Sequence, residues 1–141
     1  MSEDVKNKTN YIQMKIQPRF KDTDAIGHIN NASISTWFEE SRREIFKIFI
    51  PDLDPKKWNL IVARVETDYL AQTSYQEEVL VECGIEKIGN SSFKVFHRAF
   101  QNSVKVAEGR AHLVHFDYKE NKSISIPKAI RDQLMKFYIG D

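Results

Sequence analysis

The sequence predicts an α+β fold in which an antiparallel sheet of about five strands covers one long helix. Apolar residues recur at helical spacing across residues 31–49, which corresponds to about five turns. Segments that alternate apolar with polar residues stand before and after this helix and are typical of strands with one buried face. Tight turn signals separate the later segments, so we expect consecutive strands there to pair antiparallel.

The helix has clear start and stop signals. Asn30 and Asn31 stand at its expected beginning, and Pro51 follows its end. Asparagine is a preferred capping residue because its side-chain oxygen accepts a hydrogen bond from an otherwise unpaired helical N–H. The stripe expected to face the core contains Ile34, Trp37, Phe38, Ser41, Ile45, Ile48 and Phe49. The first strand is expected just before the helix, at residues 11–17.

Four strands and a short helix are expected to follow. The strands cover residues 60–70, 79–88, 92–100 and 104–118. Gly89-Asn90 and Asn102-Ser103 supply the turns between the last three strands. Pro127, at a first helical position, opens the C-terminal helix.

The last of these strands has a face of small residues, Ala107, Gly109 and Ala111. Such small side chains would let the long helix lie close to the sheet, and we expect this close packing. The competing interpretation is a local bend, because glycine in a strand often marks one.

Composition limits the class of protein. With 41% hydrophobic and 29% charged residues, we expect one folded domain over residues 11–141 after a flexible segment 1–10. A net charge of +1 argues against a nucleic-acid partner. The sequence shows no apolar run of membrane-spanning length and no signal-peptide core, so we expect no membrane partner and a cytoplasmic location. The single cysteine, Cys83, alternates with apolar residues and is expected to be buried.

The chemically most informative stretch is residues 19–31, which follows the first strand and leads into the helix. It contains Asp22 and Asp24, then Gly27 and His28. A carboxylate beside a helix N-terminus can act as base or nucleophile, while the free N–H groups hold a developing oxyanion. The competing interpretation of both aspartates is structural, since aspartate in turns often bonds its own backbone.

Other kinds of site do not fit the sequence. His112 and His115 are three residues apart on an expected strand, so they point to opposite faces and do not share a metal. There is no Gly-x-Ser-x-Gly elbow and no glycine-rich phosphate loop with lysine. We therefore expect neither a metal nor a cofactor.

Four pieces of sequence carry a resemblance to a known family: Asp22-Thr-Asp24, Gly27-His28, Asn30-Asn31 and Glu39-Glu40-x-Arg42. Together with the turn at residues 88–93 and the Ile-Pro start of the last helix, they resemble the hot-dog-fold acyl-CoA thioesterases, in the 4-hydroxybenzoyl-CoA thioesterase branch. The resemblance implies a helix wrapped by a curled antiparallel sheet. It also implies a homodimer or a dimer of dimers, with active sites at the subunit interface. The implied reaction is hydrolysis of an acyl-CoA to the free acid and coenzyme A, and some relatives act on acyl-carrier-protein thioesters instead.

The resemblance also implies roles for individual residues. The catalytic carboxylate falls on Asp24, and the N–H that polarises the thioester carbonyl falls near Asn31. His28 is a third catalytic candidate, because histidine titrates near neutrality; the alternative is that it orients the loop. The candidates for contacting substrate are Gly27, Asn30, Trp37, Tyr69, Lys87, Lys94 and Arg98.

Several alternatives stay open at this point. Many relatives carry tyrosine where this chain has Ile34, and the turn at residues 89–92 lacks the basic run that some relatives use on the nucleotide phosphates. One alternative is therefore that the carrier is a protein, and another is that the whole domain is a non-catalytic module that binds acyl thioesters or a partner protein. Trp37 is either core or the floor of an acyl pocket. Glu39 and Arg42, three apart on the helix, are expected to pair with each other.

Overall fold

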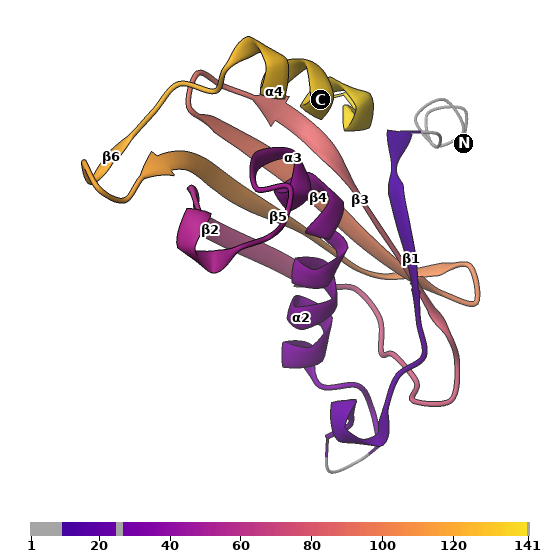
Figure 1. Ribbon diagram of the computed structural model, residues 1–141. Helices are drawn as coiled ribbons and strands as arrows, with labels where there is room; N and C mark the ends of the chain where they lie inside the picture. The colour runs from indigo at the N-terminus through magenta and orange to yellow at the C-terminus, as the bar shows by residue number, and fades with distance from the viewer. Residues whose placement is uncertain (1–9, 25–26, 141) are drawn as a thin grey trace.

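An antiparallel sheet curls around a central helical segment in the computed structural model, which describes residues 10–24 and 27–140 (Figure 1). The strands are β1 (Ile12–Ile16), β2 (Leu60–Tyr69), β3 (Val79–Ile88), β4 (Ser92–Gln101), β5 (Val104–Asp117) and β6 (Lys122–Ser123). The helices are α2 (Asn31–Ser41), α3 (Arg43–Phe49) and α4 (Lys128–Leu134). Most of the segment expected to be flexible, residues 1–9, lies outside the described residues, as do residues 25–26 and 141.

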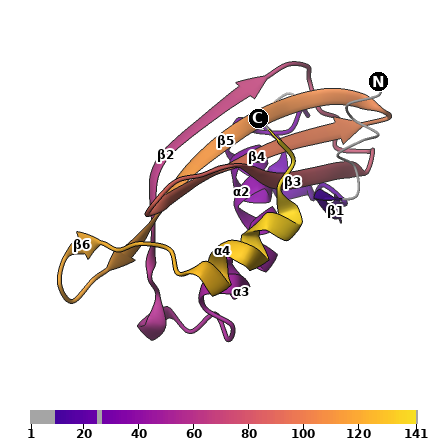
Figure 2. The ribbon, with the colours of Figure 1, turned by 90° about the horizontal axis from the view of Figure 1, so that it is seen from above.

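The sheet has the strand order β1-β3-β4-β5-β2, with β6 added to the end of β5. Every neighbouring pair is antiparallel, as the turn signals predict. Asn102 and Ser103 have φ angles of 53° and 66°, the conformation of a two-residue hairpin turn between β4 and β5. Figure 2 shows the sheet arching over α2 and α3, with α4 lying alongside. The expected α+β hot-dog architecture is confirmed, and β2 forms one edge of the sheet.

The prediction of a single helix over residues 31–49 is wrong in one respect, because the helix breaks at Arg42. The backbone of Arg42 has a ψ of 0°, outside the α-helical region. Two side chains donate hydrogen bonds to backbone carbonyl groups at the break. Ser41 Oγ donates to the carbonyl of Phe38 at 2.6 Å, and Cys83 Sγ donates to the carbonyl of Ser41 at 3.2 Å. A serine that bonds back to a carbonyl one turn earlier often bends a helix.

Close packing of helix and sheet is confirmed at the face of small residues. Ala107 and Ala111 are fully buried. A Cβ atom on Gly109 would lie 3.3 Å from the Phe38 ring on α2 and 2.7 Å from the carbonyl oxygen of Glu66 on β2. Glycine is therefore needed at position 109 to admit the helix side chain and the neighbouring strand. None of the described helices is long and apolar enough to span a membrane.

The expected burial of Cys83 and the expected opposite faces of His112 and His115 are also confirmed. Cys83 is fully buried, and burial raises the pKa of its thiol to about 11. His115 is buried with Nδ1 3.2 Å from the carbonyl of Ser125, whereas the His112 side chain contacts Glu66 on the other face of the sheet. Among the described residues there is no group of three or more His, Cys, Asp or Glu side chains that could hold a metal ion.

Candidate active site

Asp22 fastens the loop between β1 and α2 to the start of the helix. Its carboxylate is 5% exposed and accepts hydrogen bonds from the backbone N–H of Arg19 at 2.8 Å and the hydroxyl of Ser33 at 3.0 Å. Its carbonyl accepts the N–H of Asn30 at 2.7 Å. A carboxylate engaged in this way organises backbone, which agrees with the structural interpretation of Asp22.

Asp24 and His28 are brought together by a tight reversal of the chain. The Asp24 N–H donates to the carbonyl of His28 at 2.8 Å, and the His28 N–H donates to Asp24 Oδ1 at 3.2 Å. Gly27 has a φ of 85°, in the left-handed region that glycine adopts without steric cost, and its N–H donates to the carbonyl of Asp24 at 3.2 Å. The backbone thus positions the Asp24 carboxylate next to His28.

The helix begins as its sequence signals predict. Asn30 is the N-cap, and its side-chain oxygen accepts the N–H of Ala32 at 2.8 Å. Asn31 is the first residue of α2. The Ser33 N–H donates to the Asn30 carbonyl at 3.0 Å, so within the described chain the Asn31 N–H is the first-turn donor left for a ligand at this partly positive end of α2.

A cavity of about 320 Å³ joins these elements. Its lining includes Asp24, His28 and Asn31, together with Tyr69 from the end of β2. The Tyr69 hydroxyl points toward Asn31 and lies 3.4 Å from its carbonyl oxygen. The structure therefore places all three candidate catalytic residues and one substrate-binding candidate around a single cavity.

Thr73 is a residue of this cavity that sequence reasoning missed. It is 3% exposed, and its carbonyl accepts the N–H of Ile29 at 3.0 Å. Its hydroxyl oxygen has no hydrogen-bond partner within the described part of the chain. A buried unsatisfied hydroxyl costs about 1–3 kcal/mol, so a polar ligand atom or a water in the cavity would relieve that cost. In the sequence Thr73 lies in a polar run that indicates only a turn.

Three other substrate-binding candidates, Trp37, Gly27 and Asn30, have structural positions. Trp37 is 5% exposed and packs in the core cluster of α2. Gly27 and Asn30 serve the turn and the helix cap, as described above. Ile34, on the same face of α2 as Asn31, lines the cavity.

The basic candidates separate into two places. Lys87 and Lys94 are cross-strand partners on β3 and β4, and with His112 they line a second cavity of about 280 Å³. Arg98 lies apart from them. It is 9% exposed, and its Nε is 2.8 Å from a carboxylate oxygen of Glu82 in a buried ion pair.

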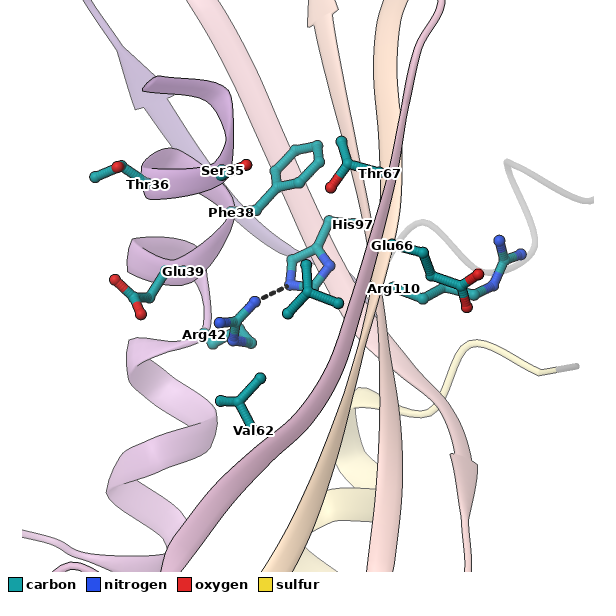
Figure 3. A pocket seen from close by; sticks show the side chains of 11 residues that line it. Ser35, Thr36, Phe38, Glu39, Arg42, Val62, Glu66, Thr67, His97 and Arg110 are labelled. Carbon is teal, nitrogen blue, oxygen red and sulfur yellow. Dashed lines mark hydrogen bonds between the residues drawn. The ribbon is translucent and has the colours of Figure 1, made fainter. Parts of the chain in front are cut away.

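A third cavity, of about 240 Å³, lies between α2 and β2 and contains two buried polar side chains, Arg42 and His97 (Figure 3). Arg42 Nη1 is 3.1 Å from His97 Nε2, and His97 Nδ1 is 3.2 Å from the carbonyl of Gly109. Arginine only donates, so His97 Nε2 is the acceptor and the imidazole proton lies on Nδ1, donating to Gly109. The expected ion pair between Glu39 and Arg42 is wrong, since no ion pair among the described residues includes Arg42.

Burial dominates the electrostatics of this pair. Desolvation, helped by the charge of Arg42, lowers the pKa of His97 to about 3. Desolvation also lowers the pKa of Arg42, against the opposing charge of Glu39. His97 is therefore neutral at physiological pH, and sequence reasoning gave no sign of it, because a histidine on an alternating strand carries no special signal.

Comparison with known proteins agrees with this architecture. The model of the thioesterase-like superfamily matches residues 18–134. A predicted thioesterase from Bacillus stearothermophilus superposes with a TM-score of 0.88 at 41% identity, covering 91% of this chain and 96% of that one. A thioesterase from Thermus thermophilus, complexed with coenzyme A and Zn, superposes with a TM-score of 0.75 at 29% identity, covering 86% and 95%.

A curated relative matches over a shorter range. The uncharacterized protein YsmA of Bacillus subtilis (strain 168) is 32% identical over 83 residues, which are 59% of this chain and 56% of that protein. The family match, by contrast, spans most of the chain and includes both the loop with Asp24 and the helix that it precedes. The chain therefore belongs to the thioesterase-like superfamily and is a hot-dog-fold thioester hydrolase.

Proposed function

We propose that this protein hydrolyses an acyl-CoA to the free acid and coenzyme A, with Asp24 as the catalytic carboxylate. The observation that carries the proposal is the single cavity lined by Asp24, His28 and the first turn of α2. The Thermus thermophilus relative was crystallised with coenzyme A, which supports this carrier for the acyl group. The alternative carrier is an acyl carrier protein, and rates on the two kinds of thioester distinguish them.

The chemistry needs a nucleophile and a site for negative charge. Asp24 either deprotonates a water or attacks the acyl carbon itself to form a mixed anhydride, which water then hydrolyses. The thioester oxygen becomes negative as the bond forms, and the Asn31 N–H at the start of α2 stabilises it. One such donor contributes roughly 3–4 kcal/mol in enzymes where it has been removed. The thiolate of the carrier leaves, and the Thr73 hydroxyl serves as a further polar contact for the acyl carbonyl or the attacking water.

Recognition of the nucleotide end is assigned to the two lysines of the second cavity. Lys87 and Lys94 face each other across β3 and β4, and their charges suit the phosphates of coenzyme A, although Lys94 Nζ also lies 3.7 Å from a carboxylate oxygen of Glu86. Replacing both with methionine should raise KM for acyl-CoA more than it lowers kcat. Arg98 is not part of this proposal, because Glu82 already neutralises its charge.

The quaternary structure proposed is a dimer formed at the β2 edge. This strand has no partner on its outer side among the described residues. It exposes Val62, Val65 and Tyr69 at 43%, 55% and 43%, and unpaired apolar edges tend to associate. Tyr69 also lines the candidate active site, so pairing here would place each site beside the other subunit. Light scattering should give the mass of a dimer or a dimer of dimers, and a monomer would contradict the proposal.

The decisive experiment compares thiol release from a panel of acyl-CoAs by the wild type and by Asp24→Asn. Loss of the carboxylate should lower kcat by about 10²–10⁴-fold, the usual contribution of a positioned base. Asp132→Asn, an acid-to-amide change on the exposed face of α4, is the matched control and should keep full activity. Thr73→Val should lower kcat/KM without loss of stability, because it removes a buried hydroxyl that has no partner within the described chain.

Two results would refute the proposal. A folded Asp24→Asn variant with wild-type turnover would remove Asp24 from the mechanism. A wild type that binds acyl-CoA in calorimetry yet releases no thiol from CoA or carrier-protein esters would favour the non-catalytic binding module instead.

A further inference from the structure

The cavity that contains Arg42 continues the same groove as the candidate active site. Asn31 and Ile34 line the active-site cavity, and Ser35 and Phe38, one turn further along α2, line the cavity with Arg42. On the facing strand Tyr69 lines the first cavity. Thr67 lies two residues away on β2, on the same face as Tyr69, and lines the cavity that contains Arg42. The two cavities therefore follow one another between α2 and β2.

The cavity that contains Arg42 holds a positive charge, and no carboxylate of the described residues forms an ion pair with it. Arg42 is 4% exposed, and its Nε is buried without a hydrogen-bond partner in the described part of the chain. Its Nη1 contacts His97, which is uncharged, and its guanidinium lies over the apolar ring of Phe46. Burying a guanidinium without a carboxylate is costly, so the arrangement favours binding of an anion beside it.

Three other charged residues, Glu39, Glu66 and Arg110, also line this cavity, and none of them forms an ion pair with Arg42 among the described residues. Glu66 and Arg110 extend to the far side of β2 from Arg42 (Figure 3). Glu66 contacts His112 and Arg64, and Arg110 is 2.9 Å from Glu86. Glu39 is an exposed residue of α2 whose charge acts on Arg42, but the two side chains form no ion pair within the described part of the chain. An anion that reaches Arg42 must therefore come from outside these groups.

We propose that this cavity receives the distal end of the acyl group and that Arg42 selects acyl groups ending in a carboxylate. This inference rests on the proposed function, since it starts from a thioester held at Asp24. A carboxylate accepts strong, charge-assisted N–H···O hydrogen bonds from a guanidinium. Phe38, Val62 and Val65 provide apolar walls for the methylene chain that leads there.

Geometry also limits the length of the acyl group. Arg42 lies about three helical turns beyond Asn31, a rise of roughly 16 Å. Helical side chains lean toward the N-terminus, which shortens the distance that the ligand must span. The acyl group expected is therefore of medium length, and very short acids should not reach Arg42.

The test measures kcat/KM for matched pairs of thioesters that differ only at the distal end. The pairs are hexanoyl-CoA with adipoyl-CoA, octanoyl-CoA with suberoyl-CoA, and decanoyl-CoA with sebacoyl-CoA. The wild type should favour the carboxylate-ended member of at least one pair by about tenfold or more, the effect of a charge-assisted hydrogen bond. Arg42→Met should abolish this preference, chiefly through KM, whereas Arg42→Lys should keep part of it. Arg43→Met, an arginine of α3 whose side chain is 56% exposed, is the control and should behave as wild type.

Free acids give a readout that needs no variant. Suberate should inhibit the wild type more strongly than octanoate, and calorimetry should detect its binding. Should no CoA ester be hydrolysed, the proposed function fails, yet suberate binding that is lost in Arg42→Met would still support the cavity assignment. Equal kcat/KM within every pair, with equal inhibition by suberate and octanoate, overturns the inference. It is equally overturned if Arg42→Met dissociates the oligomer and leaves the selectivity unchanged, because Arg42 then binds the second subunit.

Discussion

Acidification should destabilise this fold through His97. The imidazole is 1% exposed, and desolvation lowers its pKa from the usual 6.5 to about 3. In the unfolded chain the same histidine regains its ordinary pKa. Between pH 6.5 and pH 3 the unfolded state therefore binds a proton that the native state excludes, and stability falls as pH falls. The stability that neutral His97 allows is fully present above pH 6.5 and is lost progressively as the pH falls below that value.

The size of the effect follows from the difference in pKa. One pH unit below the unfolded pKa corresponds to about 1.4 kcal/mol, so at pH 5 the loss from this residue is about 2 kcal/mol. The charge of Arg42, 3.1 Å away, works in the same direction, because a second positive charge on His97 would be repelled. Few carboxylates with ordinary pKa values titrate above pH 5, so His97 should dominate this range.

The measurement is urea unfolding at pH 7, 6 and 5 and at one fixed protein concentration. Between pH 7 and pH 5 the free energy of unfolding of the wild type should fall by about 2 kcal/mol more than that of His97→Gln. The variant itself should be less stable at pH 7, since it disturbs a buried pair. Equal pH dependence of the two proteins would refute the reasoning, as would an NMR titration in which the native imidazole takes up its proton near pH 6.

Two further predictions concern packing and assembly. Gly109→Ala should destabilise the fold by about 1–3 kcal/mol in urea unfolding, because its Cβ would lie 2.7 Å from the backbone oxygen of Glu66. Gly89→Ala, whose Cβ would meet a serine hydroxyl at 3.2 Å, should be nearly neutral, and an equal loss in both variants would show that backbone crowding is not the cause. Val65→Lys should dissociate the proposed dimer in light scattering, whereas Val104→Lys, also 55% exposed but on the β4–β5 hairpin, should not. A dimer that survives the change at Val65 would rule out association through β2.

Local signals in the sequence predict most of the fold. Alternation of apolar and polar residues predicts the bounds of β3, where the alternate residues Val79, Val81, Cys83 and Ile85 are all buried. The Asn102-Ser103 turn is equally local, since asparagine tolerates a positive φ and serine is a common turn residue. The helix break is different. It involves Cys83, a residue 42 positions from Ser41, and such a contact exists only after folding.

The candidate site divides in the same way. Asp24, His28 and Asn31 lie within one short loop and helix start, so their proximity follows from the sequence. Thr73 reaches the cavity only because its backbone pairs with Ile29, and no local pattern predicts that bridge. Helical spacing also suggests the wrong partner for Arg42. Glu39 is the near neighbour along the helix, but α2 presses Arg42 into the sheet, where it meets a histidine 55 positions away.

The burial of Cys83 matters for a protein that handles thioesters. Every turnover brings an activated acyl group into the molecule and sets free a thiol of the carrier. A surface thiolate could capture that acyl group by transthioesterification, or trap the carrier as a mixed disulfide. The only sulfhydryl of this chain lies beneath the helix, with a pKa of about 11, where it stays protonated and out of reach. The cysteine is thus protected from acylation by the substrate, and native preparations should contribute almost no background in assays that count free thiols.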